Sequence, residues 1–322
     1  MEDLIVSVAQ RTLIAGTPLL IGTIGEVICE RSGILNLGVE GVMAIGAVAA
    51  FVVTFYTQNL WLGLMAAILA GMVISIIHAF ASVSLQSNQV VSGLALTMLG
   101  LGISSLAGKP YVGKSLAEKM DTVAIPFLSD IPIVGKILFM QSPFFYMAIG
   151  LALAAWFVLE YTELGIKIRS AGENPKATEA QGVNVSLIRY GCILVGGGFS
   201  GMAGANLSIS YSKLWIEGMT AGRGWIVIAL TIFALWNPMR ALVGAFLFGG
   251  IFVLQYLLQP LGISPNFLAM LPSIATLLVL LLIGLKDSRQ LSAPAMLGEP
   301  YKRGEREGTI TFRITEVVDP QC

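Results

Sequence analysis

Three long stretches of the chain carry no charged side chain, and they restrict what it can fold into. They run from Gly41 to Gly108, from Gly191 to Ser212 and from Ala241 to Leu285. An uncharged apolar run of 18 or more residues is typical of a helix that crosses a membrane. Only 12% of the 322 residues are charged, about half the usual share in a soluble domain. The sequence therefore predicts an all-α, polytopic membrane protein.

The apolar stretches divide into about eight to nine predicted transmembrane helices, with broken or re-entrant segments among them. We expect a transmembrane domain over residues 1–285 and a charged C-terminal tail over residues 286–322. The segment from Gly224 to Trp236 is short for a bilayer core of about 30 Å, so a re-entrant path is the alternative for it. The expected segments are Arg11–Ile28, Val42–Tyr56, Trp61–Val83, Val90–Leu106, Phe144–Leu159, Gly191–Ile209, Gly224–Trp236, Ala241–Leu258 and Phe267–Leu285.

Lysine and arginine collect in two polar regions, which indicates the cytoplasmic side of the membrane. The first region is the polar island, residues Thr162 to Tyr190, which lies between two apolar segments. The second is the C-terminal tail. Alternation of about nine segments then places the N-terminus and the loop from Lys109 to Gln141 outside. The last residues, Thr309 to Cys322, are expected to form a flexible tail.

The polar island contains the pattern of a very short helix. Asn174 is a good N-cap, and Pro175 suits the first helical position, where a missing N–H is harmless. Gly182 can adopt the left-handed conformation that ends a helix, while Ala177 and Ala180 lie on one face. A helix of two turns is not stable alone, so we expect it to dock on another surface.

Polar residues at the starts of spans are candidates for a solute route. Asn36 and Glu40 occur among glycines just before a span, a composition typical of a broken helix that lines a pathway. Asn88, Gln89 and Ser92 have a similar setting at the start of the fourth span, and Asn206 lies near the end of a later one. We interpret these six residues as lining a route for a neutral polar solute. Glu30 and Arg31 are interpreted as marking the membrane boundary.

The glycine-rich run around Gly196 formally matches GxGxxG, but it follows no predicted strand, so dinucleotide binding is not expected. Small residues spaced about one turn apart instead favour close packing between helices in lipid. The packing residues predicted here are Gly197, Ser200, Gly201 and Gly204.

Other functional classes lack their motifs. The chain has no GxxxxGK[ST] loop, so it is not expected to bind ATP itself. There is no HExxH or GxSxG motif, and no catalytic residue or metal site is predicted. The cysteines Cys29, Cys192 and Cys322 are scattered, the single histidine, His78, is interpreted as a hydrogen-bonded packing residue, and the zero net charge suggests no nucleic-acid partner.

Several stretches together resemble the membrane permease subunits of bacterial ABC importers, in the branched-chain amino acid and simple-sugar group. The resemblance extends over about residues 10–305 and is greatest to the second permease of nucleoside and simple-sugar systems with binding lipoproteins. The residues that carry it are Thr17–Leu20, Glu30–Gly41, Gly172–Ala177, Gly182–Val183, Met219–Trp225, Trp236–Pro238 and Ala293–Tyr301.

This resemblance implies that the polar island is a coupling loop whose short helix inserts into a groove on a cytoplasmic ABC ATPase. The coupling residues it implies are Gly172, Glu173, Asn174, Pro175, Ala177, Ala180 and Gly182. It also implies a second permease subunit, an extracytoplasmic substrate-binding lipoprotein, ATP and Mg²⁺ held by the ATPase, and a place in the bacterial cell membrane. The implied solute is a nucleoside or a simple sugar, moved inward by alternating access.

Two other functions remain open on the residues alone. A secondary transporter driven by an ion gradient is the first alternative, but its coupling carboxylates are expected inside spans, where only Glu26 and Glu40 qualify. An intramembrane enzyme is the second alternative, and no acid–base or metal constellation in the sequence supports it.

Overall fold

The computed structural model describes residues 2–118, 120–284 and 293–302, and these residues form a helical bundle. Within them, seven helices are long and apolar enough to cross a membrane, and two apolar helices are shorter. The prediction of an all-α, polytopic fold is therefore confirmed. The long helices are α1 (Glu2–Arg31), α2 (Val39–Thr57), α3 (Leu60–Ala79), α4 (Gln89–Gly108), α6 (Pro143–Tyr161), α9 (Val185–Ala205) and α11 (Pro238–Leu258).

The remaining elements are short. Two π-helical turns extend long helices, η1 (Phe80–Ser84) after α3 and η3 (Asn206–Tyr211) after α9. A two-stranded antiparallel hairpin, β1 with β2, occupies the loop predicted between Lys109 and Gln141. The other elements are η2 (Lys109–Tyr111), β1 (Val123–Ala124), α5 (Val134–Leu138), β2 (Met140–Gln141), α7 (Glu163–Glu173), α8 (Pro175–Ala180), α10 (Arg223–Phe233), η4 (Gln259–Leu261), α12 (Pro265–Ala269) and α13 (Leu271–Gly284).

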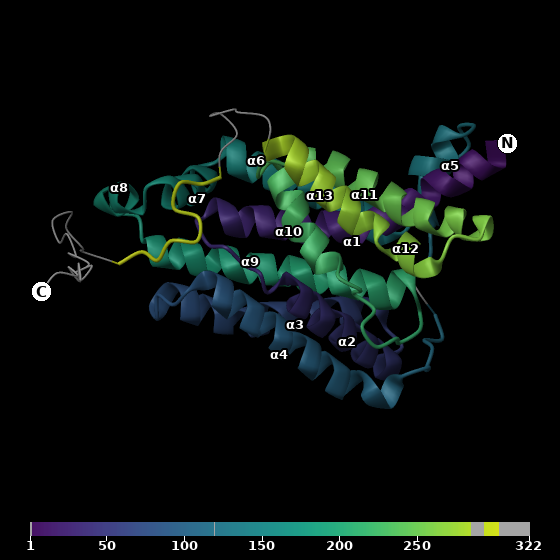
Figure 1. Cartoon of the computed structure of the whole chain (residues 1–322), viewed down its shortest axis with the longest axis horizontal. Coiled ribbons are helices and arrows are strands. Elements are labelled where there is room, and N and C mark those ends of the chain that lie inside the picture. Colours follow the sequence, from purple (N-terminus) through teal and green to yellow (C-terminus); the bar gives the residue numbers. More distant parts are fainter. Residues whose placement is uncertain (1, 119, 285–292, 303–322) are drawn as a thin grey trace, which may run out of the picture.

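Helices α1, α2 and α9 form the centre of the bundle, where α1 and α2 each pack along α9 (Figure 1). Helices α3 and α4 cover one side of this centre, where α3 packs along α9 and α4 packs along α2. Helices α11 and α6 cover α1 on the other side. Because the central helices touch protein on most faces, side chains such as Leu19, Phe51 and Ile193 are fully buried.

The bundle has two ends, which are named here after a helix that lies at each (Figure 1). The α8 end carries α7, α8, the turn 32–38 and residues 293–302. The α5 end carries the N-terminus, the hairpin loop and α12. The polar island and the described part of the tail thus share one end, while the N-terminus and the Lys109–Gln141 loop share the other. Of the predicted tail, residues 286–292 and 303–322 lie outside the described residues. The second of these ranges includes the segment Thr309–Cys322, which was expected to be flexible.

Helix α10 runs through only part of the membrane thickness. Its 11 residues rise about 16 Å, roughly half of a bilayer core. The span predicted from Gly224 to Trp236 therefore does not cross alone. From the α5 end, the chain enters the bundle as a non-helical loop, residues 212–222. Helix α10 then continues toward the α8 end. Because the chain passes from one end of the bundle to the other, this segment is a broken span, not a re-entrant one, and the alternation of segments is kept.

Glycines of α9 allow its backbone to lie in direct contact with neighbouring helices. A Cβ atom on Gly204 of α9 would overlap the carbonyl oxygen of Met43 in α2, and one on Gly201 would overlap that of Ala67 in α3. At Gly197 the nearest atom would be the Ser75 hydroxyl oxygen. The fourth residue of the predicted set, Ser200, is fully buried. Such small-residue contacts allow dispersion forces to act over a long interface.

Replacing Gly204 by alanine is expected to destabilise the protein by about 3 kcal/mol, since the added methyl group must push α9 away from α2. The matched control is Gly191→Ala in the same helix, where nothing lies within 4 Å of the added atom. That control is expected to be neutral or slightly stabilising. Thermal unfolding of both variants in detergent measures the difference, and equal midpoints would contradict this packing.

Candidate functional site

Helix α8 forms as its sequence predicts. The Asn174 side-chain oxygen accepts a hydrogen bond from the Ala177 amide at 3.0 Å, and Pro175 occupies the first helical position. Gly182 follows with a φ of +82°, which a glycine adopts without strain. The predicted short helix is confirmed, and both of its ends are fixed by these local contacts.

One face of α8 is turned outward and the other is docked on the protein. Ala177 and Ala180 are exposed on the outer face. Thr178 is 5% exposed, and its hydroxyl donates to the Asn174 carbonyl oxygen at 2.8 Å. Pro175 is also buried. The outward face therefore carries the small side chains of Ala177 and Ala180 beside the exposed Lys176, while Thr178 belongs to the docked face.

A segment near the C-terminus, residues 293–302 and here called the C-terminal clasp, lies against the polar island. The Met296 amide donates to the carbonyl oxygen of Gly172 at 2.9 Å, and the Gly298 amide donates to that of Gly33 at 3.3 Å. The Ala295 amide donates to the Glu173 carboxylate at 3.3 Å. The clasp thus joins the end of α7 to the turn between α1 and α2.

Tyr301 of the clasp connects α8 to the rest of the bundle. Its hydroxyl donates to the carboxylate of Glu179 in α8, and its ring lies 5.8 Å from the guanidinium of Arg189. Gln86 donates to the Tyr301 carbonyl oxygen at 3.3 Å. Since Gln86 precedes α4 and Arg189 belongs to α9, Tyr301 joins α8 to α9 and to the segment before α4.

Arg189 is buried beneath the polar island. It is 2% exposed, and its Nε donates to the Ser32 carbonyl oxygen at 3.2 Å. One Nη donates to the Ala171 carbonyl oxygen at 3.5 Å. A buried guanidinium requires such acceptors. Arg189 therefore fastens α9 to the ends of α1 and α7.

Glu30 and Arg31 lie at the end of α1, and both contact Trp236. Glu30 is 1% exposed, and the Trp236 indole N–H donates to its carboxylate. Arg31 Nε donates to the Trp236 carbonyl oxygen at 3.0 Å. At this end of α1, a tryptophan distant in sequence covers Glu30. Both residues anchor the chain between α10 and α11.

Glu40 holds the start of α10. One carboxylate oxygen accepts from the Thr220 hydroxyl at 2.6 Å and from the Gly222 amide at 2.9 Å, and the other accepts from the Gly224 amide at 2.6 Å. The negative charge also opposes the positive end of the α10 dipole. Although Glu40 is at a break in the membrane path, its acceptor atoms are occupied by the protein.

The other residues predicted to line a solute route are also held by internal bonds or caps. Asn36 accepts from the Gly38 amide at 3.0 Å and donates to Glu26 at 3.4 Å. Gln89 accepts from the Leu35 amide at 2.7 Å and donates to the Glu299 carbonyl oxygen at 3.4 Å. The structure thus brings Asn36 and Gln89 to the turn 32–38, beside the C-terminal clasp.

The last three of these residues, Asn88, Ser92 and Asn206, have other surroundings. Asn88 is exposed and caps α4, and the Ser92 hydroxyl lies 3.0 Å from Nδ1 of His78, which is buried. His78 is thus a hydrogen-bonded packing residue, as predicted. Asn206 is buried in η3, and its side-chain oxygen has no partner among the described residues. The solute route through these residues stays a prediction.

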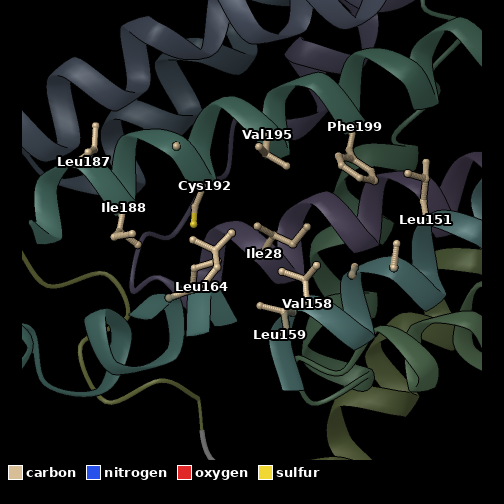
Figure 2. A pocket seen from close by; sticks show the side chains of 14 residues that line it. Ile28, Leu151, Val158, Leu159, Leu164, Leu187, Ile188, Cys192, Val195 and Phe199 are labelled. Carbon is tan, nitrogen blue, oxygen red and sulfur yellow. The ribbon is translucent and has the colours of Figure 1, made fainter. Parts of the chain in front are cut away.

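A wholly apolar cavity of about 490 Å³ lies near the α8 end, among α1, α6, α7 and α9. Figure 2 shows Ile188, Cys192 and Val195 of α9 on the side of that helix that faces Ile28 of α1 and Val158 of α6. A polar solute would lose its hydrogen bonds in such a lining, at a cost of a few kcal/mol per group. This cavity is therefore unsuited to a nucleoside or a sugar.

Sequence reasoning missed part of the α8 assembly. The stretch Ala293–Tyr301 was noted only because it contributes to the family resemblance, and no local pattern in it shows where it docks. Helix α7 was not predicted either, although Thr162 caps it by accepting from the Gly165 amide at 3.2 Å. A threonine followed by an amphipathic run was the available signal.

Comparison with known proteins supplies the family. The family model described as the permease component of the branched-chain amino acid transport system matches residues 8–283. TsgC13 of Haloferax volcanii, an ABC transporter permease protein whose name assigns it to glucose, is 39% identical over 91% of this chain and 96% of its own length.

Two bacterial relatives are named for nucleosides. The guanosine ABC transporter permease protein NupQ of Bacillus subtilis is 37% identical over 93% of this chain and 97% of its own length. The nucleoside ABC transporter permease protein NupC of Lactococcus lactis is 35% identical over 85% and 91%. A weaker relative in Bacillus subtilis, the guanosine ABC transporter permease protein NupP, is 24% identical over 73% and 70%.

These matches extend over most of the chain, and the helical bundle has the spans that a multi-pass protein of the cell membrane requires. The chain is an ABC importer permease subunit and belongs to the family of permease components of the branched-chain amino acid transport system.

Proposed function

We propose that this chain is the permease subunit of a nucleoside importer and that α8 docks into a groove of a separate ATPase. The observation that carries the docking is the outward face of α8, where Ala177 and Ala180 are exposed on a helix fixed at both ends. Small side chains let a helix approach a partner closely. ATP and Mg²⁺ are bound by the ATPase, and this chain carries out no chemical step.

The route of coupling follows the contacts of the α8 assembly. Tyr301 joins α8 to Arg189 in α9 and to the residues before α4. The clasp joins α7 to the turn before α2. Closure of the ATPase would therefore displace several helix ends together, which is how a coupling free energy reaches a distant site.

Two further subunits complete the proposed importer. A second, different permease is supported by Bacillus subtilis, where two guanosine permease proteins, NupQ and NupP, both match this chain. An extracytoplasmic lipoprotein would deliver the solute to the α5 end. The nucleoside assignment is supported by the names of NupQ and NupC, and glucose is the competing solute because of TsgC13.

Uptake into proteoliposomes that contain the complete importer tests the solute. We expect ATP-dependent accumulation of labelled guanosine and uridine, with labelled glucose at the background of vesicles lacking this chain. A tenfold excess of unlabelled glucose is expected to leave guanosine uptake unchanged. Accumulation of glucose without nucleosides would reject the proposed solute, but the assignment to the permease family would still hold.

A further inference from the structure

A second cavity, of about 360 Å³, lies in the half of the bundle toward the α5 end and has a lining suited to a flat polar solute. Its volume is within the range of small-molecule sites, about 300–1,000 Å³. It opens among α1, η3 and α11. The lining residues are Arg11, Ile14, Ala15, Tyr211, Phe252, Val253, Tyr256 and Leu257.

The lining combines aromatic rings with one guanidinium. Tyr211, Tyr256 and Phe252 supply three rings, and Arg11 is an exposed cation on the first helix. No lining residue is acidic. Aromatic faces stack on nucleic-acid bases, and a guanidinium presents a rigid fork of donors.

Arg223 supports this wall from behind. It is 9% exposed, and its guanidinium lies 5.6 Å from the centre of the Tyr211 ring and 5.0 Å from that of Phe252. Its Nη1 donates to the carbonyl oxygens of Met219 at 3.0 Å and Thr220 at 3.2 Å. Since Glu40 binds the amides of Gly222 and Gly224 on either side, Arg223 is a positioning residue that fixes two of the rings.

We propose that this cavity binds the base of a 6-oxopurine nucleoside such as guanosine or inosine. The base stacks on the tyrosine rings, and the Arg11 guanidinium donates two hydrogen bonds to O6 and N7. This is the pairing by which arginine selects guanine in nucleic acids, whereas adenine presents an amino group at position 6. The proposal rests on the nucleoside function proposed above and adds the base class and the residue that selects it.

A simple sugar fits this lining less well. Its hydroxyl groups donate hydrogen bonds, and the lining offers no carboxylate to accept them. A phospholipid headgroup would also use Arg11, but it would not need the three rings or the buried support of Arg223. The observations therefore favour a planar solute with acceptors on one edge.

The test compares Arg11→Gln with the unaltered importer in proteoliposomes, with saturating binding lipoprotein and labelled guanosine or adenosine. We expect the initial rate for guanosine to fall about tenfold, since one bidentate pair to guanine is lost. The rate for adenosine is expected to change less than twofold. Lys136→Gln is the matched control, a basic residue at the same end of the bundle that is absent from the cavity lining.

A second variant tests the rings. Tyr256→Leu is expected to lower the rates for both nucleosides by about tenfold, since stacking on one aromatic face is lost, while Tyr256→Phe retains most of both rates. These variants are also checked for unchanged amounts of assembled importer in the vesicles.

The outcomes separate this inference from the proposed function. An unchanged ratio of guanosine to adenosine uptake in Arg11→Gln would overturn the site while leaving nucleoside import standing. Equal losses for both nucleosides that are restored in vesicles enriched in phosphatidylglycerol would assign Arg11 to a lipid headgroup and overturn it too. Import of glucose alone by the unaltered protein would reject both proposals.

Discussion

Replacing Ala177 or Ala180 by tryptophan is expected to lower ATP-dependent uptake at least tenfold. Both residues lie on the outward face of α8, so a large ring there would hold the helix away from the ATPase groove. A loss of about 1.4 kcal/mol in that contact already changes an equilibrium tenfold. ATP hydrolysis by the assembled complex is expected to continue without responding to the loaded binding lipoprotein.

The control for these variants is Ser186→Trp, which also introduces a large ring at an exposed position of the polar island, in the first turn of α9. Its uptake is expected to stay within twofold of the unaltered importer. Uptake per assembled complex and stimulated ATP hydrolysis are the two measurements. Normal coupling in both alanine variants would show that α8 is not the docking element.

Replacing Glu40 by glutamine is expected to destabilise the protein by about 3 kcal/mol and to abolish most uptake. Both carboxylate oxygens accept hydrogen bonds, and an amide nitrogen cannot accept from the Gly224 N–H. A buried donor left without a partner costs about 1–3 kcal/mol, and the favourable charge at the start of α10 is also lost.

Glu163→Gln is the matched control for Glu40→Gln. The Glu163 side chain is 90% exposed and lies 3.8 Å from Lys167, so its loss is expected to change the free energy of unfolding by less than about 0.5 kcal/mol. Unfolding in detergent is followed by denaturant titration for both variants. If Glu40→Gln were as stable as Glu163→Gln, the carboxylate would not be what holds the α10 start.

Local chemistry made part of this structure predictable. The caps of α8 could be predicted because Asn174, Pro175 and Gly182 act on their own neighbours in the chain. The membrane spans could be predicted because an apolar run of 18 or more residues without a charge is long enough to cross a bilayer and is uncommon in soluble helices. Both signals depend on residues close together in sequence.

The remaining features depend on contacts between distant residues. Glu40 was recognised as an unusual charge, but its partners lie some 180 residues away and include two backbone amides, which no side-chain pattern reveals. The burial of Glu30 under Trp236 and the docking of the clasp on Gly172 have the same character. The cavity with Arg11 and Tyr256 also joins α1 to α11, so its lining could not be read from either segment.

The two ends of the bundle are linked by continuous helices. Helix α1 carries Arg11 toward the α5 end and Arg31 at the α8 end, and α9 carries Arg189 at one end and leads through η3 to Tyr211 at the other. A rigid helix that moves at one end moves at the other. The proposed docking at α8 and the proposed solute binding near Arg11 would in this way be connected through α1 and α9.

The energy source of uptake tests the central claim most directly. The complete importer is placed in proteoliposomes with labelled guanosine, and uptake is measured with ATP and Mg²⁺ available to the ATPase, with and without ionophores that collapse all ion gradients. The account predicts uptake that requires ATP, persists with the ionophores and is lost in Ala180→Trp. Uptake that continues without ATP and stops with the ionophores would contradict it and would identify an ion-driven transporter instead.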